Sequence, residues 1–360
     1  MPNRTALYDA HVAAGGKMVD FAGWSLPINY GSQLDEHHAV RSNAGMFDVS
    51  HMTVVDIRGP QARPFLRRLL ANDIAKLKES GQALYGCMLN EEGGVIDDLI
   101  TYFLDADFYR TVVNAATREA DLEWIRRQAA EFDFEIQERD DLAMIAVQGP
   151  KARQQVIKLL KAPGLDTLKP FRATSHGDYF VARTGYTGED GFEVLLPASQ
   201  ALAFWTGLLD AGVIPCGLGA RDSLRLEAGL NLYGQDMDTT TSPLESNLGW
   251  TVAFEPDDRE FIGRQALKKQ QSNGVDRQLV GLVLERGAIP RTGAMVETQA
   301  GPGQVTSGSF GPTIERPIAL ARIPTGSFDN VEVELRGKRL PARVVKPPFV
   351  RAGKVKVFHT

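Results

Sequence analysis

Two ten-residue stretches, VVDIRGPQAR at residues 54–63 and MIAVQGPKAR at residues 144–153, share one pattern. Each predicts a strand, a Gly-Pro turn and the start of a helix. Proline is favourable just inside a helix, because its missing N–H would have no partner there. The copies begin 90 residues apart (position 54 to position 144), which is too far for a solenoid repeat. The pattern fits two β-α-β halves of one split ferredoxin-like layer.

Strands and helices are expected to alternate around these two copies. The predicted strands cover residues 84–89, 95–104 and 108–114, and the predicted helices cover residues 117–131, 199–211 and 218–229. Thr117 is the expected N-cap of the first of these helices. A polar stretch at residues 268–278 predicts a linker. The short strands after it, separated by Gly and Pro, are typical of a small β-barrel or jelly-roll module.

The composition excludes several classes of protein. With 360 residues, 43% of them hydrophobic, the chain can fill the cores of two or three domains. It has no long apolar run, and its net charge is -5, so neither a membrane helix nor a nucleic-acid partner is expected. It has no phosphate-binding loop, no dinucleotide fingerprint and no metal-ligand motif, so no metal is expected. Two distant cysteines and a start without an apolar signal segment favour a cytoplasmic protein.

An acid pair interrupts the second predicted strand. The stretch GGVIDDL at residues 93–99 places Asp97 and Asp98 among apolar residues, where burying a carboxylate is costly without a partner. Successive strand residues face opposite ways, so only one of the two acids can face a given pocket. The paired glycines would let a ligand or another backbone approach closely. Two solvated acids at the entry of a strand are the alternative interpretation.

A glycine-rich turn, RTGYTGEDGFE, covers residues 183–193 and carries two aromatic and three acidic side chains. A pterin ring presents an amino group beside a ring N–H, and one carboxylate can accept both hydrogens in a bidentate pair. Tyr186 can stack or hydrogen-bond beside such a ring. The alternative is a β-hairpin whose acids only keep it soluble.

Two arginines follow in GLGARDSLRLE at residues 217–227. Arg221 and Arg225 are four residues apart and share a helix face. Guanidinium groups suit carboxylates, which include the tail of a ligand and a buried acid. The alternative is a charge network within the helix that involves Asp222 and Glu227. The next motif, NLYGQDMD at residues 231–238, indicates only an ordered polar loop.

Taken in order, these segments resemble the aminomethyltransferase (T-protein) family of the glycine cleavage system. Three further stretches carry the resemblance: MVDFAGW at residues 18–24, EHHAVR at 36–41 and GMFDVSHM at 45–52. It extends from about Leu7 to about Gly353. It is specific because many motifs recur in order, and no single one decides it.

The resemblance implies an α+β fold, in which three domains form a cloverleaf around a central folate site. Residues 1–275 would form the folate-binding region. That region would hold a discontinuous first domain and a ferredoxin-like second domain, the latter roughly within residues 52–225. Residues 276–360 would form the C-terminal jelly-roll-like β domain.

The resemblance also implies the reaction and its residues. The lipoyl arm of an H-protein would bring an aminomethyl group, and tetrahydrofolate would take its carbon as co-substrate, with no metal. Asp97, the first acid of the pair, would lie near the reacting nitrogens of the folate, and Glu193 would bind the pterin. The other residues implied to line the folate site are Arg225, Arg351, Tyr186, Tyr85, Asn114 and Tyr233.

Three alternatives differ in recognisable features. A folate-binding accessory protein of iron–sulfur maintenance, without transferase activity, would carry a cysteine in the loop at residues 231–238, and this loop has none. The folate half of an oxidative demethylase would need a flavin-binding domain. A non-catalytic, folate-stabilised partner could have lost Asp97, which is present.

Overall fold

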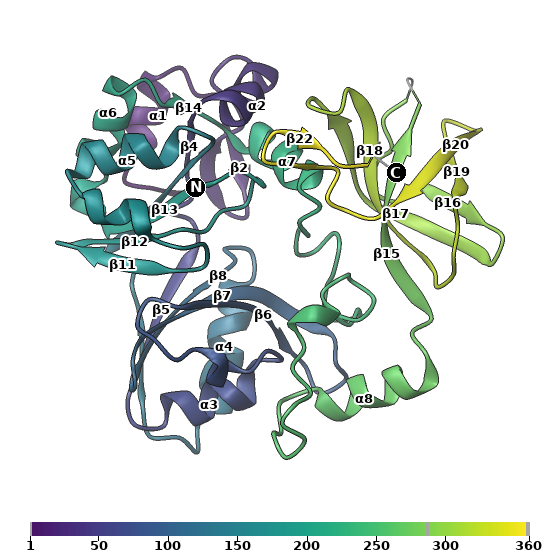
Figure 1. Ribbon diagram of the computed structural model, residues 1–360, viewed down its shortest axis with the longest axis horizontal. Coiled ribbons are helices and arrows are strands. Elements are labelled where there is room, and N and C mark those ends of the chain that lie inside the picture. Colours follow the sequence, from purple (N-terminus) through teal and green to yellow (C-terminus); the bar gives the residue numbers. More distant parts are fainter. Residues whose placement is uncertain (1, 286–287, 358–360) are drawn as a thin grey trace.

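The computed structural model describes residues 2–285 and 288–357 (Figure 1). Two mixed α/β units and a β-barrel make up most of the chain, and α7 (Leu218–Glu227) lies where one unit meets the barrel. Among the described residues, no helix is both long and apolar enough to cross a membrane.

The first unit is built on a five-stranded sheet with the strand order β6-β7-β8-β5-β9. Its elements are, in chain order, β5 (Thr53–Arg58), α3 (Ala62–Leu69), β6 (Ala83–Leu89), β7 (Val95–Asp105), β8 (Phe108–Val113), α4 (Arg118–Ala129) and β9 (Glu135–Glu138). Apolar side chains of α3 and α4 share one core with the strands, among them Phe65, Leu66, Leu122 and Ile125. The predicted strands and the predicted helix of this region are therefore present.

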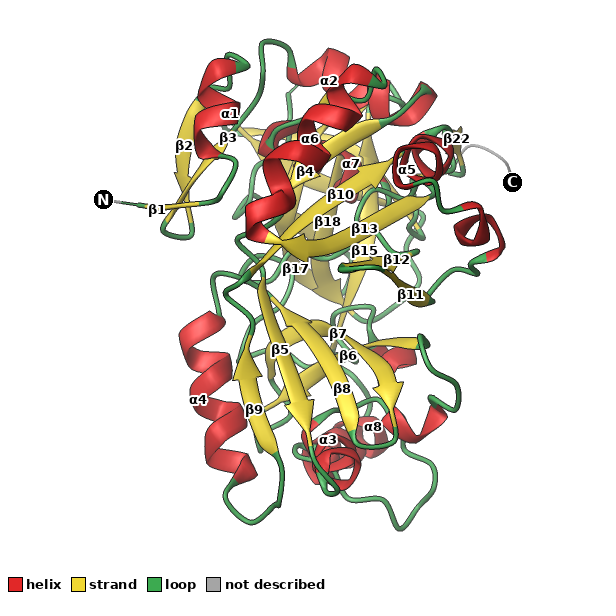
Figure 2. Ribbon diagram, turned by 90° about the vertical axis from the view of Figure 1, so that its left-hand side faces the viewer, coloured by secondary structure: helices red, strands yellow, loops and turns green. Residues whose placement is uncertain are grey.

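The second unit is built on a six-stranded sheet with the order β11-β12-β13-β10-β4-β14 (Figure 2). Its elements are β10 (Leu142–Gln148), α5 (Ala152–Leu160), β11 (Ala173–His176), β12 (Tyr179–Ala182), β13 (Gly191–Pro197), α6 (Ala201–Asp210) and β14 (Ile214–Pro215). The N-terminal residues supply β1 (Asn3–Arg4), α1 (Tyr8–Ala13), β2 (Met18–Phe21), β3 (Trp24–Pro27), α2 (Gln33–Ser42) and β4 (Gly45–Asp48). Of these, β4 is inserted between β10 and β14.

The sequence repeat marks the start of each unit. Its first copy forms β5 and α3, and its second copy forms β10 and α5. The prediction that the copies are halves of one layer is wrong, because they belong to different sheets. Both units run strand, helix, three strands, helix, strand, and their strand orders match except for the inserted β4. The repeat thus records two units with similar topology, not one.

The C-terminal part is a closed barrel with the strand order β15-β18-β17-β16-β19-β20. Its strands are β15 (Arg277–Leu284), β16 (Met295–Thr298), β17 (Gly301–Gly311), β18 (Arg316–Pro324), β19 (Asn330–Leu335) and β20 (Lys338–Val345). Val331, Val333 and Leu335 of β19 are buried while the residues between them are exposed, as expected for a strand with one face in the core. The predicted C-terminal β-barrel is therefore present.

One local prediction is wrong, and another is right only in position. The stretch expected to be a linker is mostly α8 (Arg264–Asn273), which buries Leu267, so the polar composition marks the exposed face of a helix. Thr117 does precede α4, but its side chain does not cap the helix. Its hydroxyl donates to the carbonyl oxygen of Asn114 at 3.1 Å instead.

Candidate active site

The acid pair of β7 is split between two environments. Asp97 is fully buried and accepts hydrogen bonds from the backbone N–H of Asn114 (3.0 Å) and from its side-chain amide (2.8 Å). Asp98 keeps part of its surface open and accepts from the Tyr85 hydroxyl at 2.8 Å and from the same Asn114 amide at 3.0 Å. The geometry therefore does not favour the prediction that Asp97 faces a ligand. Asp98 is the acid with a free face.

Burial perturbs both acids in the same direction. It raises the pKa of Asp98 to about 7, and the neighbouring charge of Asp97 adds to this effect. Burial also raises the pKa of Asp97 well above its usual range, and the nearby charge of Asp121 adds to this effect. A carboxyl group that titrates near neutral pH is suited to accept a proton and to release it again.

The paired glycines before β7 admit another segment of the backbone. A Cβ atom on Gly94 would lie only 1.9 Å from the carbonyl oxygen of Thr239. The backbone N–H of Val95 donates to the carbonyl oxygens of Asp238 (3.1 Å) and Thr241 (2.9 Å). The glycines thus hold the loop after residue 230 against β7. That loop carries Tyr233, whose hydroxyl donates to the carbonyl oxygen of Val95 at 3.2 Å.

Glu193 lies on β13 of the second unit and is connected to the first. Its carboxylate accepts a 2.5 Å hydrogen bond from the Thr184 hydroxyl, whose oxygen lies 3.2 Å from the hydroxyl of Tyr102 on β7. Because the single Thr184 proton is used on Glu193, Tyr102 must donate to Thr184. Burial raises the pKa of Glu193, while Thr184 and Arg221 oppose that shift.

Tyr186 interacts with residues from other elements of the site. Its hydroxyl donates to the carbonyl oxygen of Asn231, and the Arg221 guanidinium lies 4.8 Å from the centre of its ring. Burial raises its pKa, and Asp98 across the unit boundary acts in the same direction. Tyr186 is therefore near both Asp98 of the first unit and Arg221 of α7.

The two arginines of α7 have different roles. Arg225 is buried and donates to Asp222 and Asp236 (both 2.8 Å), to Ser307 (3.0 Å) and to the carbonyl oxygen of Leu230 (3.2 Å). It ties α7 to the following loop and to β17, with almost every donor used. The prediction that it contacts folate is therefore not favoured.

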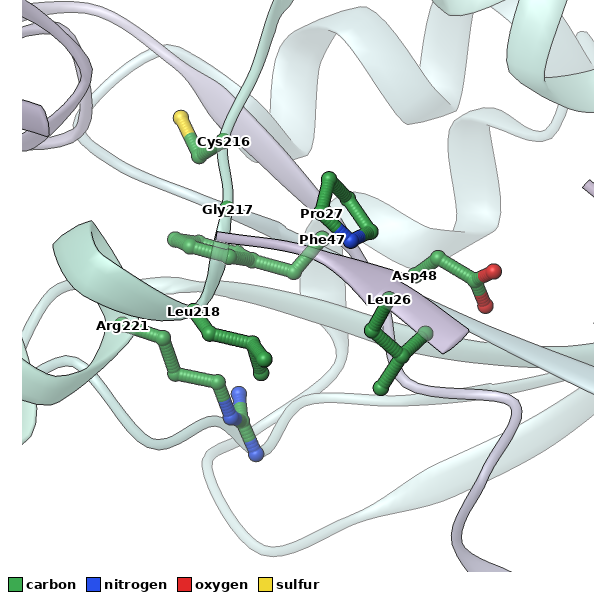
Figure 3. A pocket seen from close by; sticks show the side chains of 8 residues that line it. All are labelled: Leu26, Pro27, Phe47, Asp48, Cys216, Gly217, Leu218 and Arg221. Carbon is green, nitrogen blue, oxygen red and sulfur yellow. The ribbon is translucent and has the colours of Figure 1, made fainter. Parts of the chain in front are cut away.

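Arg221 is the arginine that keeps a free donor. Its Nη1 atom is buried and has no partner among residues 2–285 and 288–357. Arg221 also lines a small pocket, together with Leu26, Phe47 and Asp48 among others (Figure 3). That pocket contains Arg221 but not Asp98, Tyr186 or Glu193, so we do not identify it with the site. Helical spacing alone gave no way to choose between the two arginines.

Arg351 and Trp250 lie at the edge of the site. Arg351 is exposed on β21 (Val350–Arg351), which pairs with β22 (Lys354–Val355). The turn between these strands rests on the glycine-rich turn, because the backbone N–H of Gly353 donates to Glu189 at 2.7 Å. Trp250 is 68% exposed and stacks on Tyr85 with ring centroids 5.9 Å apart. Sequence reasoning missed it, since a lone tryptophan carries no pattern.

Known proteins match the whole chain. Residues 7–256 match the family model described as the GCVT N-terminal domain, and residues 277–351 match that of the glycine cleavage T-protein C-terminal barrel domain. Two proteins named aminomethyltransferase, from Xanthomonas axonopodis pv. citri and Stenotrophomonas maltophilia, are each 56% identical to this chain. The alignments cover 98% of this chain and 98% and 97% of those relatives, respectively.

A solved structure agrees with these matches. The crystal structure of glycine cleavage system aminomethyltransferase T from Bartonella henselae superimposes with a TM-score of 0.92 at 36% sequence identity. The match covers 99% of this chain and 100% of that one. The chain belongs to the glycine cleavage T-protein family.

Proposed function

We propose that this protein is the aminomethyltransferase of a glycine cleavage system. It transfers the one-carbon unit of the aminomethyl group, carried on the lipoyl arm of H-protein, to tetrahydrofolate. The products are 5,10-methylenetetrahydrofolate, ammonia and the dihydrolipoyl carrier. The observation that carries this proposal is that Tyr186 lies near Asp98 of the first unit and Arg221 of α7, and that Arg221 in turn acts on Glu193. Full-length similarity to proteins named aminomethyltransferase supports it.

The second unit, α7 and β21 supply the groups that suit the co-substrate. Glu193 is held by Thr184 and can accept both hydrogens from the amino group and ring N–H of a pterin. The unused Nη1 donor of Arg221 suits a carbonyl or carboxylate oxygen of the same ligand. Arg351 at the exposed edge suits the anionic tail. Tyr85, Tyr233 and Asn114 complete the wall on the side of β7.

The first unit supplies the group that suits the chemistry. A folate nitrogen attacks the aminomethyl carbon, and the C–S and C–N bonds to that carbon break in turn. The two N–H hydrogens of the folate end on the lipoyl sulfur and on ammonia. Asp98 is placed to accept such a proton and to stabilise the positive charge of an iminium ion. We thus propose for Asp98 the position near the reacting nitrogens that the sequence predicted for Asp97.

We also propose the domain division that the resemblance implies, with a folate-binding region at residues 1–275 and a β domain at residues 276–360. A discontinuous first domain is supported by the insertion of β4 beside β10. The ferredoxin-like second domain would be the unit from β5 to β9, which lies inside the proposed span of residues 52–225.

The decisive experiment is single-turnover transfer. The protein is mixed with aminomethyl-loaded, lipoylated H-protein, with and without tetrahydrofolate, while methylenetetrahydrofolate and ammonia are followed. Folate-dependent formation of both methylenetetrahydrofolate and ammonia supports the proposal. Folate binding without turnover would favour the accessory protein instead.

The rate should depend on pH through Asp98. Because the carboxylate form accepts the proton, the single-turnover rate at saturating folate should rise as the pH increases through about 7. The rise should be absent in Asp98→Asn. A rate that falls over the same interval would contradict the role of a proton acceptor.

Replacement of Glu193 should weaken the binding of folate. Glu193→Ala leaves the pterin donors without an acceptor, which we expect to cost about 1–3 kcal/mol, or about 5- to 150-fold in affinity. Titration calorimetry with tetrahydrofolate measures the change. Glu193→Gln is the matched control, since it keeps one acceptor oxygen and should lose less. Equal affinity in all three proteins would exclude the contact.

A further inference from the structure

A third buried carboxyl group lies next to the acid pair. Asp121 is in the first turn of α4, and its side chain, like that of Asp97, is completely buried. The carboxyl groups of Asp97 and Asp121 are neighbours, and each affects the pKa of the other. Two carboxylates in contact and shielded from water cannot both ionise readily, because each repels the other's charge.

The donors around the two carboxyl groups are unevenly shared. Asp97 accepts from the backbone N–H and from the side-chain amide of Asn114. Both oxygens of Asp121 are sealed from solvent and have no donor within the part of the chain that the structure describes. The Thr117 hydroxyl faces Asp121, but its proton goes to the carbonyl oxygen of Asn114. A buried acceptor needs a donor, and a proton on the adjoining Asp97 supplies it.

Among residues 2–285 and 288–357, the other titratable groups that we find to interact with this pair bring no positive charge. They are Asp98, the next residue of β7, Cys87 on the adjacent β6, and Tyr233 in the loop packed on β7. Burial raises the pKa of Asp97 well above its usual range and that of Asp121 to about 7. Both pKa values are raised, as expected for carboxyl groups that lack hydrogen-bond donors.

We propose that Asp97 and Asp121 share one proton, so that the pair carries a single negative charge and acts as a positioning group for Asp98. Asn114 makes the link, because its side-chain amide donates both to Asp97 (2.8 Å) and to Asp98 (3.0 Å). The pair fixes the orientation of this amide. Its charge also disfavours ionisation of Asp98, which keeps that carboxyl group a better proton acceptor. The inference rests on the proposed role of Asp98.

Infrared spectroscopy tests the shared proton without reference to activity. The wild-type protein, labelled with ¹³C-aspartate, is measured at a pH well above the titration of Asp98. We expect the C=O stretch of a protonated aspartic acid in the wild type and in Asp98→Asn, but not in Asp121→Asn, where the amide donates to an ionised Asp97. If this band is missing from the wild type, the proposal is overturned even if transfer activity is never observed.

The pH profile of single-turnover transfer tests the effect on Asp98. Asp121→Asn keeps one negative charge on the pair, whereas the double variant Asp97→Asn/Asp121→Asn carries none. The midpoint of the acid limb should therefore fall by about one pH unit in the double variant Asp97→Asn/Asp121→Asn and should not fall in Asp121→Asn. A purely structural role predicts the same midpoint in both variants, and that result would overturn the effect on Asp98.

Discussion

Asp98→Asn should lower the single-turnover transfer rate by about 10²- to 10⁴-fold while the affinity for tetrahydrofolate changes little. The substitution keeps the size of the side chain, and the amide oxygen can still accept the hydrogen bond from Tyr85. It removes the negative charge and the ability to take a proton. Both are needed only as the reaction proceeds, so the loss should appear in the rate and not in ground-state binding.

Asp97→Asn is the matched comparison for this variant. The new amide would retain one acceptor oxygen, but Asp97 now accepts two hydrogen bonds from Asn114, so part of that contact is lost. We expect a smaller loss of rate than in Asp98→Asn. A larger loss in Asp97→Asn would restore the role that sequence reasoning gave to Asp97. Calorimetric titration with tetrahydrofolate and thermal unfolding distinguish a loss of rate from a loss of folding.

The acid pair shows which features of the site could be predicted from the sequence and which could not. Strand alternation correctly indicates that Asp97 and Asp98 do not share one environment. It does not indicate which side of β7 faces α4, because that depends on how helices far along the chain pack on the sheet. Burial of Asp97 against Asp121 is a tertiary contact across 24 positions (from 97 to 121) with no local pattern.

The repeated stretch shows the same limit at the level of the fold. It correctly predicts strand, turn and helix in both places, since these depend on local residues. It does not predict that β4 from the N-terminal segment enters the second sheet beside β10. Strand pairing of this kind depends on residues about 100 positions apart, such as Phe47 and Ala146. The C-terminal barrel was easier, because three of its six strand pairings, β16–β17, β17–β18 and β19–β20, join strands that follow each other directly in the chain.

The arginines of α7 lead to the second large prediction. Arg225→Met should destabilise the protein by about 3–5 kcal/mol, because it leaves the buried carboxylate of Asp236 without its guanidinium partner. Asp236 also accepts from Thr306 and Ser307 of β17, so the loss should loosen the contact between α7, the loop and the barrel. Urea unfolding followed by tryptophan fluorescence measures it, with the barrel expected to separate early.

Arg221→Met, one helical turn away, is the control that separates stability from binding. Arg221 has an unpaired buried Nη1 and contacts the Tyr186 ring. Its replacement therefore removes a donor for the ligand, but it does not deprive a buried carboxylate of a directly bonded partner. We expect unfolding close to that of the wild type and an affinity for tetrahydrofolate about 10- to 100-fold lower. If instead Arg225→Met folds normally and loses only folate affinity, Arg225 is the ligand contact after all. The two arginines lie on the same helix face, so this pair of variants tests the assignment at the point where the sequence pattern cannot distinguish them.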